Sequence, residues 1–428
     1  MTGKTHDPGL PRDTGPSALP PGDHWHDGFE IVAYHDLGGR PGFKMGIHET
    51  GGRWFLYLGH LWHRGWSVLE VTDPARPQLV RFLPGPANTW TIQMQVAGGR
   101  MVTALEKIDT GWGEDPDAPF EEGFLVWSLD DPADPRVVGR YRTGGAGSHR
   151  NFYDGGRYVH ASVVPPGFDG HIYEIVDLDD PTAPRGIGRW WVPGQWRDGG
   201  ERGVPVGTSL HAPYVVGDRA WLAYGAAGLV CLDVGDVSAP SLVSRLDFWP
   251  PFNPVIAIHS AVALPGRRLV AANSEAIAEE CDEPLNFAGL VDVAAESAPR
   301  VVSAFPLPTP PPGAAYRNFC ERGGRFGPHN LHQFQGHPAL LDRDDLIFLT
   351  WFAGGLRVVD IADPRQPREV AAFVPPDPLI RRGVLPSGRL AAQSEDVLVD
   401  ARGIVYLTDK NHGLYVLRLA GELAAAAR

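Results

Sequence analysis

The chain has 428 residues, of which 43% are hydrophobic, and it carries a formal net charge of −13 at pH 7. This apolar content is sufficient for a large core, but no run of about 20 apolar residues is present that would predict a membrane span. Lys and Arg form no cluster, which argues against nucleic acid or an anionic membrane as a partner.

The N-terminal segment, residues 1–27, is rich in Pro, Gly and charged residues and lacks the apolar stretch of a signal peptide. This composition predicts a disordered arm. The three cysteines, Cys231, Cys281 and Cys320, are too few for a disulfide framework, which favours a reducing, cytoplasmic location. Cys231 is expected in the core, and the other two in loops.

One pattern recurs along the chain: a short apolar strand, a link that contains Asp or a near-equivalent and then Pro, and a second strand. Asp and Pro indicate a turn, because Pro cannot continue a central strand. Two further strands, joined by a tight turn, precede each segment. Each unit of four antiparallel strands, a to d, predicts one blade of a β-propeller. The recurring segments are 66–82, 124–141, 172–190, 229–246, 289–305 and 356–373.

The innermost strand a of each repeat predicts an all-β fold with seven blades. These strands begin near Phe43, Thr89, Ser148, Ser209, Ile258, Pro328 and Ser394. The seventh repeat lacks an outer strand, whereas residues 29–35 form a strand without a blade. We therefore expect residues 29–35 to complete blade seven, since closure of the ring removes two exposed sheet edges. The propeller then spans residues 28–420 and a tail spans 421–428.

Four histidines occupy an equivalent position, early in strand a, in four successive repeats. They are His149, His211, His259 and His329. A propeller places equivalent positions around one axis, so we expect these imidazoles to bind a single metal ion. The other three blades carry no histidine at this position, and a structural role common to every blade would not leave three of them out.

The identity of the metal follows from its preferred ligands. Imidazole nitrogen suits Fe(II), Cu and Zn. Four ligands complete a tetrahedral zinc site, whereas an octahedral ion keeps open positions for substrate or O2. A catalytic site therefore favours Fe(II), with Cu or Zn as alternatives.

Further polar residues are expected on the same face as the four histidines. Glu106, Glu275 and Glu395 are candidates to accept the second N–H of a metal-bound imidazole. The connections between strands b and c supply candidates for substrate binding or proton transfer. These are His60, His63 and Lys410. We expect His160 and His171 to be structural, and His332 to point away from the axis.

Long loops on this face contain aromatic residues, among them Trp112, Trp196 and Phe326, and Leu379 adds an aliphatic side chain. They predict a lid over a mostly apolar pocket for a small apolar or aromatic molecule. The loops are 107–123, 193–207, 275–287, 307–327 and 375–393.

The sequence Leu-Arg-Val-Val-Asp-Ile at 356–361 resembles the motif that names the LVIVD-repeat proteins, and related phrases extend from about residue 28 to 418. The resemblance implies a β-propeller. The four-histidine arrangement is similar in kind to the iron site of carotenoid-cleaving oxygenases and to the histidine-rich metal sites of selenium-binding, methanethiol-oxidising propellers. This similarity implies a site geometry and leaves the substrate open.

Three functions follow from these observations. The first is a metal-dependent oxidoreductase, an oxidase or dioxygenase with non-haem iron, acting on a small apolar or aromatic molecule. The second is a metal-dependent lyase or hydrolase that uses His60, His63 or Lys410 as acid or base. The third is a non-enzymatic interaction scaffold, which needs no metal.

Overall fold

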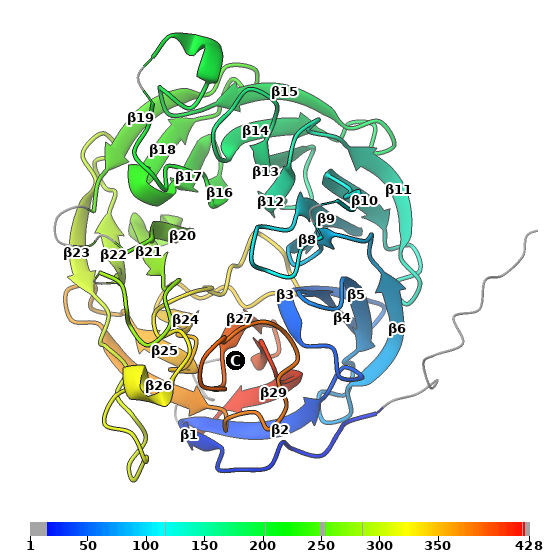
Figure 1. The fold of residues 1–428 in the computed structure, drawn as a ribbon, viewed down its shortest axis with the longest axis vertical. Coiled ribbons are helices and arrows are strands. Elements are labelled where there is room, and N and C mark those ends of the chain that lie inside the picture. Colours follow the sequence, from blue (N-terminus) through cyan, green and yellow to red (C-terminus); the bar gives the residue numbers. More distant parts are fainter. Residues whose placement is uncertain are drawn as a thin grey trace, which may run out of the picture.

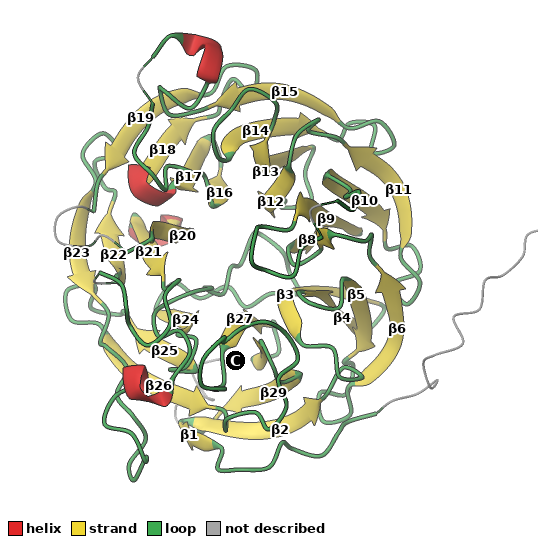
Figure 2. Ribbon diagram, viewed as in Figure 1, coloured by secondary structure: helices red, strands yellow, loops and turns green. Residues whose placement is uncertain are grey.

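A computed structural model describes residues 15–115, 117–201, 203–248, 252, 254–284, 286–421 and 423. Strands dominate this part of the chain, and the helices in it are short (Figure 2). They are α1 (Phe319–Arg322) and the 3-10 turns η1 (Arg197–Gly199), η2 (Gly225–Ala227) and η3 (Pro265–Arg267). None of the described helices has the length and apolar character needed to cross a bilayer.

The first half of the chain forms a four-stranded sheet and a nine-stranded sheet. The four-stranded sheet contains β3 (Gly42–Thr50), β4 (Arg53–His60), β5 (Gly65–Glu70) and β6 (Gln78–Pro84). The nine-stranded sheet joins two antiparallel groups through a contact between β9 and β12, and β7 (Thr89–Trp90) also pairs with β9. Its groups are β8 (Met94–Ala97), β9 (Arg100–Lys107), β10 (Gly123–Ser128) and β11 (Arg136–Tyr141), then β12 (Gly147–Phe152), β13 (Tyr158–Val164), β14 (Ile172–Asp177) and β15 (Arg185–Trp190).

Four further sheets of four strands each complete the arrangement. In two of them, the strands are consecutive in the chain. One contains β16 (Ala212–Val216), β17 (Arg219–Ala223), β18 (Leu229–Asp233) and β19 (Ser241–Leu246). The other contains β20 (Ile256–Leu264), β21 (Leu269–Glu275), β22 (Ala288–Asp292) and β23 (Arg300–Ala304). Two include an N-terminal strand: β24 (Leu346–Thr350), β25 (Leu356–Asp360), β26 (Arg368–Val374) with β1 (Trp25–Asp27), and β27 (Ser394–Val399), β28 (Ile404–Asp409), β29 (Leu414–Leu419) with β2 (Phe29–His35).

The sheets follow one another around a common axis, with β12, β16, β20 and β27 near the centre and β11, β15, β19 and β23 at the rim (Figure 1). Successive apolar side chains of a strand pack against opposite neighbours, so the core is divided into clusters. In β4, for example, Leu56 and Leu58 belong to one cluster, and Phe55 and Tyr57 belong to another. The chain is therefore an all-β propeller in which residues at the start of inner strands meet near the axis.

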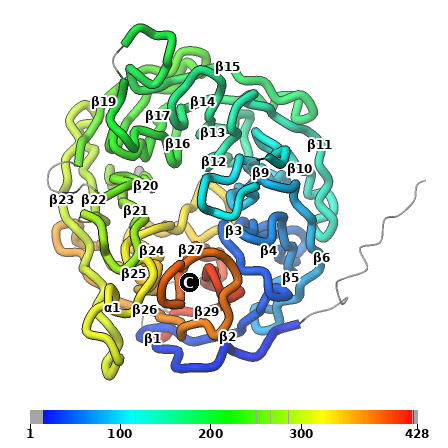
Figure 3. Tube along the Cα trace, in the orientation of Figure 1, coloured from blue at the N-terminus to red at the C-terminus, as the bar shows by residue number. Residues whose placement is uncertain are grey.

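The N-terminal and C-terminal strands lie side by side (Figure 3). β2 pairs with β29 from Phe29 opposite Leu419 to His35 opposite Leu414. Phe29 and Tyr34 are buried in one apolar cluster with residues of β29. Residues at opposite ends of the sequence thus share one sheet.

The segment expected to be a disordered arm contains an additional strand. Trp25 to Asp27 form β1, which pairs with β26 from Trp25 opposite Val374 to Asp27 opposite Ala372. The prediction is wrong for these residues because β26 offers unpaired backbone groups at its outer edge. Residues 1–14, and residues 422 and 424–428 of the expected tail, lie outside the described residues.

Four inner strands carry an irregularity in register near the axis. The shifts fall between Gly42 and Met45 in β3, Ser148 and Asn151 in β12, Ile256 and Ser260 in β20, and Ser394 and Val397 in β27. A bulge interrupts the regular alternation and redirects a side chain. The bulged segments contain His149, His259 and Glu395, all of which were predicted as site residues.

The inner segment expected to begin near Pro328 forms no regular strand in the described residues. Leu331 makes an isolated bridge with Leu349, and the backbone N–H of His329 donates to the carbonyl of Thr350 at 2.9 Å. The hydroxyl of Thr350 accepts the next backbone N–H, from Asn330, so a side chain replaces part of the ladder. His329 nevertheless remains near the axis.

Cys281 and Cys320 form a disulfide that links the loop after β21 to α1, whereas Cys231 is a buried free thiol. Their separation of 39 residues gives no sequence signal for pairing. Because disulfides are uncommon in reducing compartments, the cysteines no longer support the cytoplasmic prediction.

Candidate metal centre

The four predicted histidines form a continuous series of ring contacts near the axis. The ring centroids are 4.6 Å apart for His149 and His211, 3.8 Å for His211 and His259, and 4.6 Å for His259 and His329. His149 lies in β12 and His259 in β20, while His211 precedes β16 and His329 precedes β24. Four separate sheets or inner segments therefore bring these imidazoles together.

Hydrogen bonds at Nδ1 determine how two of the rings are oriented. Nδ1 of His149 lies 2.5 Å from a carboxylate oxygen of Glu106, and Nδ1 of His329 lies 2.7 Å from the backbone carbonyl of Glu395. A carbonyl only accepts, and so does an ionised carboxylate, so Nδ1 carries the proton in both rings. In the neutral form of each ring, Nε2 then presents its lone pair.

His259 has the same orientation, which its serine neighbour enforces. Nδ1 of His259 lies 2.8 Å from Oγ of Ser260, whose hydroxyl donates to the backbone carbonyl of His329. Because the hydroxyl proton is already used, Oγ accepts from Nδ1 of His259 and also from the buried guanidinium of Arg150. Nε2 of His259 is buried and has no hydrogen-bond partner in the described structure.

His211 lies between these rings. Its Nε2 is 2.9 Å from Nε2 of His149, and its buried Nδ1 has no hydrogen-bond partner among the described residues. Burial, reinforced by neighbouring histidines, holds the pKa of His211 and of His259 well below the usual value. Burial also lowers the pKa of His329, with the charge of Lys410 acting in the same direction. These three imidazoles are therefore neutral at pH 7, as metal ligands must be.

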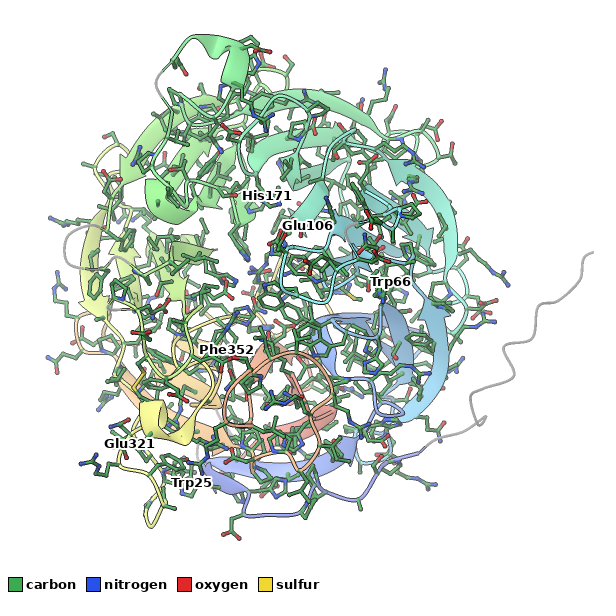
Figure 4. All side chains as sticks on the ribbon, viewed as in Figure 1. Trp25, Trp66, Glu106, His171, Glu321 and Phe352 are labelled. Carbon is green, nitrogen blue, oxygen red and sulfur yellow. A yellow bond between two sulfur atoms is a disulfide. The ribbon has the colours of Figure 1, made fainter. Side chains whose placement is uncertain are left out.

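Glu106, at the end of β9, holds two imidazoles at once. Its second carboxylate oxygen accepts from Nε2 of His171 at 2.6 Å, and Figure 4 shows these two side chains beside each other near the axis. Burial alone would raise the pKa of Glu106, but His149 and His171 outweigh it and the pKa falls to about 2. Burial likewise lowers the pKa of His149, but Glu106 reverses this effect and raises it. Glu106 therefore accepts hydrogen bonds from both His149 and His171.

Glu275 and Glu395 both have cationic partners. Glu275 ends β21 and accepts a hydrogen bond of 3.2 Å from Arg325. Glu395 forms a 2.5 Å ion pair with Lys410. Burial raises the pKa of Glu395 to about 7, although Lys410 opposes the shift, and burial lowers the pKa of Lys410. The carbonyl of Glu395, rather than its carboxylate, makes the short contact with His329.

A cavity of about 350 Å³ lies beside the imidazoles. All of the predicted site residues except His60, His63 and His259 line it. Its lining includes both charged and apolar side chains. The charged residues include Glu106, Glu275, Glu395, Arg325 and Lys410. The apolar residues are Phe43, Leu61, Trp90, Ile92, Trp112, Leu210, Val255, Ile256 and Ile277. A cavity of this size and composition accommodates a small organic molecule.

The predicted acid–base residues are not brought together. Both ring nitrogens of His60 are engaged, by the carbonyl of Pro41 and the hydroxyl of Ser67, so His60 supports the fold. His63 is exposed and lies outside the cavity. Lys410 is the member of this set that lines the cavity.

Of the loop residues predicted to cover the pocket, some line the cavity and others do not. Trp112 lines the cavity and stacks near Trp62, with 5.9 Å between ring centroids. Trp196 and Leu379 are 43% and 78% exposed and do not line it. Phe352, labelled in Figure 4, stacks on His329 at 4.6 Å.

Several polar residues that line the cavity were not predicted as site residues, among them His171 and Arg325. His171 was expected to be structural, yet it bonds Glu106; its place directly before β14, in a connection between strands b and c, was the available signal. Arg325 comes from the long loop 307–327, and nothing in its local sequence indicates that it reaches Glu275. Long loops are not confined by strand periodicity, so their contacts follow from the tertiary structure alone.

The comparisons with known proteins agree with the fold. A family model described as the LVIVD repeat matches residues 214–247, which cover most of the sheet from β16 to β19. The curated proteins that were searched include no match to this chain.

Solved structures similar to this chain include β-propellers. The chain resembles the β-propeller domain of Cps50 (Swd1) from Myceliophteria thermophila, with a TM-score of 0.53 and 12% identity, over 89% of this chain and 99% of that one. It also resembles Raptor from Chaetomium thermophilum (0.54, 10%, covering 90% of this chain and 28% of Raptor) and Sqt1 from Saccharomyces cerevisiae (0.50, 9%, covering 90% and 86%). At these identities the similarity concerns the fold alone. The fold is a β-propeller. Within that class, the matched segment supports an LVIVD-repeat propeller.

Proposed function

We propose that this protein is a seven-bladed propeller, closed by residues 29–35, that binds one divalent transition metal, Fe(II), through His149, His211, His259 and His329. It acts as an oxidoreductase on a small apolar or aromatic molecule. The observation that carries the proposal is the shared orientation of His149, His259 and His329: the Nδ1 atom of each ring is engaged, so Nε2 is the nitrogen that would bind the metal. This arrangement is similar in kind to the iron site of carotenoid-cleaving oxygenases.

The residues present fit a metal ion well. Neutral imidazole nitrogens suit Fe(II), and the buried, unpartnered nitrogens of His211 and His259 gain a partner when an ion is bound. When bound, such a metal supplies a redox centre or a Lewis acid next to the substrate. Glu106 and the carbonyl of Glu395 keep the two outer imidazoles in the binding orientation.

The remaining residues of the cavity prepare the substrate site. Trp90, Trp112 and Phe43 provide apolar surface, which binds an uncharged or aromatic molecule and excludes water. Arg325 and Lys410 are both paired with carboxylates, so neither is available as an unpaired cation to select an anionic substrate. The charge of the site thus favours a neutral ligand.

Replacing Trp112 by Ala is expected to weaken the binding of an aromatic probe by about 10-fold or more, since burial of a large apolar side chain contributes roughly 1.5–3 kcal/mol. Fluorescence titration with a neutral naphthalene derivative measures this effect. Trp196→Ala is the matched control, because Trp196 is an exposed tryptophan outside the cavity. Equal loss in both variants would contradict a role of Trp112 in the pocket.

Elemental analysis of the full-length protein, purified without chelators, tests the proposal directly. We expect iron near one atom per chain, and oxygen consumption with an aromatic substrate panel. Copper at the same ratio would support the proposed oxidoreductase activity but would replace Fe(II) as the assigned metal. A protein that holds no metal, even after anaerobic loading with Fe(II), Cu(II) or Zn(II), would overturn the proposal and leave the scaffold function.

A second candidate function is a metal-dependent lyase or hydrolase. Lys410 favours it, because this buried amine lines the same cavity and forms an ion pair with Glu395. Zinc near one atom per chain, with turnover that does not depend on oxygen, would support this alternative.

A further inference from the structure

Glu275 and Glu106 are both buried glutamates beside the imidazole series, yet their distances to the rings differ. Glu106 lies 2.5 and 2.6 Å from two ring nitrogens, which are hydrogen-bond lengths. The oxygens of Glu275 lie 3.5 Å from Nε2 of His259 and 3.8 Å from Nε2 of His329, which is too long for a hydrogen bond. Glu275 therefore approaches two imidazoles without bonding to either.

The groups that face one another around Glu275 are all acceptors. Nδ1 of His259 and Nδ1 of His329 carry the ring protons, so each Nε2 directs a lone pair toward the carboxylate. Arg325 donates to one oxygen of Glu275 from its outer side. Nε2 of His259, which lies 3.5 Å from the carboxylate, has no hydrogen-bond partner in the described structure. A cation placed between the carboxylate and the two nitrogens would interact favourably with all three acceptors.

The spacing matches a shared ion. Donor atoms held at about 2.0–2.2 Å from one metal lie roughly 3–4 Å from each other. His211, His259 and Glu275 offer ligand atoms that all lie within 4.8 Å of one another. Glu106, His149 and His171 form a second group with this spacing, but in that group the carboxylate is already hydrogen-bonded to both rings.

We propose that Glu275 is a direct carboxylate ligand of the metal, alongside the histidines, and that Arg325 holds it in place. This inference rests on the proposed metal centre and deepens it. Four imidazoles and one carboxylate would reduce the net charge of a bound divalent ion and its ligands to +1. The hard oxygen donor also favours Fe(II) over Cu(I). The apolar side chains of the cavity would hold the organic substrate beside the metal.

Cobalt substitution of the full-length protein tests this assignment without relying on turnover. Co(II) titration gives the affinity, and the visible absorption of Co(II) reports the number and type of its ligands. Glu275→Gln keeps the shape but removes the charge, and we expect an affinity at least about 10-fold weaker together with a changed spectrum. Glu275→Asp, which retains a carboxylate, is expected to bind Co(II) more tightly than Glu275→Gln.

Glu174→Gln is the matched control, because Glu174 is a buried glutamate in β14 that is paired with an arginine, Arg189, away from the cavity. It should match the wild-type affinity and spectrum. Circular dichroism confirms that each variant is folded. If wild type binds Co(II) and Glu275→Gln shows the same affinity and spectrum, Glu275 is not a ligand and the histidine centre stands. If wild type does not bind Co(II), the metal centre itself is overturned.

Discussion

Replacing His259 by Ala is expected to reduce the metal content of the purified protein to less than about a tenth of wild type. Mutation of a residue that only supports a ligand typically weakens metal affinity about 10–100-fold, and loss of a direct ligand weakens it more. His259 is central to the series, and its ring contacts both His211 and His329. Its buried Nε2 has no protein hydrogen bond to lose. The substitution also removes the 2.8 Å hydrogen bond between Nδ1 and Ser260, so a melt of the metal-free protein measures its effect on the fold.

Inductively coupled plasma mass spectrometry and a thermal melt, with and without added Fe(II), measure this result. We expect wild type, but not His259→Ala, to gain stability from the metal, since a ligand that binds only the folded state raises the melting temperature. His26→Ala is the control, because His26 is an exposed histidine of β1. Retention of full metal content by His259→Ala would show that the histidines do not act together.

Deletion of residues 1–36 is expected to yield an insoluble product or one without a cooperative unfolding transition. The deletion removes β2, and with it Phe29 and Tyr34 from a buried cluster. Each buried aromatic side chain contributes roughly 3–5 kcal/mol, and a folded protein has only about 5–15 kcal/mol in total. The edge of β29 that pairs with β2 would also become available for aggregation.

Deletion of residues 1–14 is the matched control, because it leaves β1, β2 and every described contact of these strands intact. Its solubility and melting temperature should equal those of wild type. A soluble, cooperatively folded protein lacking residues 1–36 would show that β2 is not needed to complete its sheet. Adding a peptide of residues 25–36 in trans offers a further check.

Some of the site was accessible from local sequence. The strand and turn pattern predicted a propeller because alternation and Asp-Pro links are properties of neighbouring residues. The repeat register then selected His149, His211, His259 and His329, whose rings are in contact in the structure. Glu106 was predicted to support a histidine, and it bonds His149.

Other parts depended on contacts between distant segments. His60 was predicted to act in the site, but its ring is used by Ser67 and Pro41 within its own sheet. Arg325 reaches Glu275 across 50 residues of sequence, and Cys281 meets Cys320 across 39. No periodic pattern encodes such contacts, since they link loops to strands that are brought close by the arrangement of the sheets.

The sequence by itself determined the all-β repeat and the register of the four histidines, because a repeat preserves equivalent positions. The tertiary structure alone decided which nitrogen of each ring is engaged, that Glu275 approaches both His259 and His329, and that β1 joins β26. These features depend on bulges that redirect side chains and on distances between sheets. Both arise only after the strands have packed around one axis.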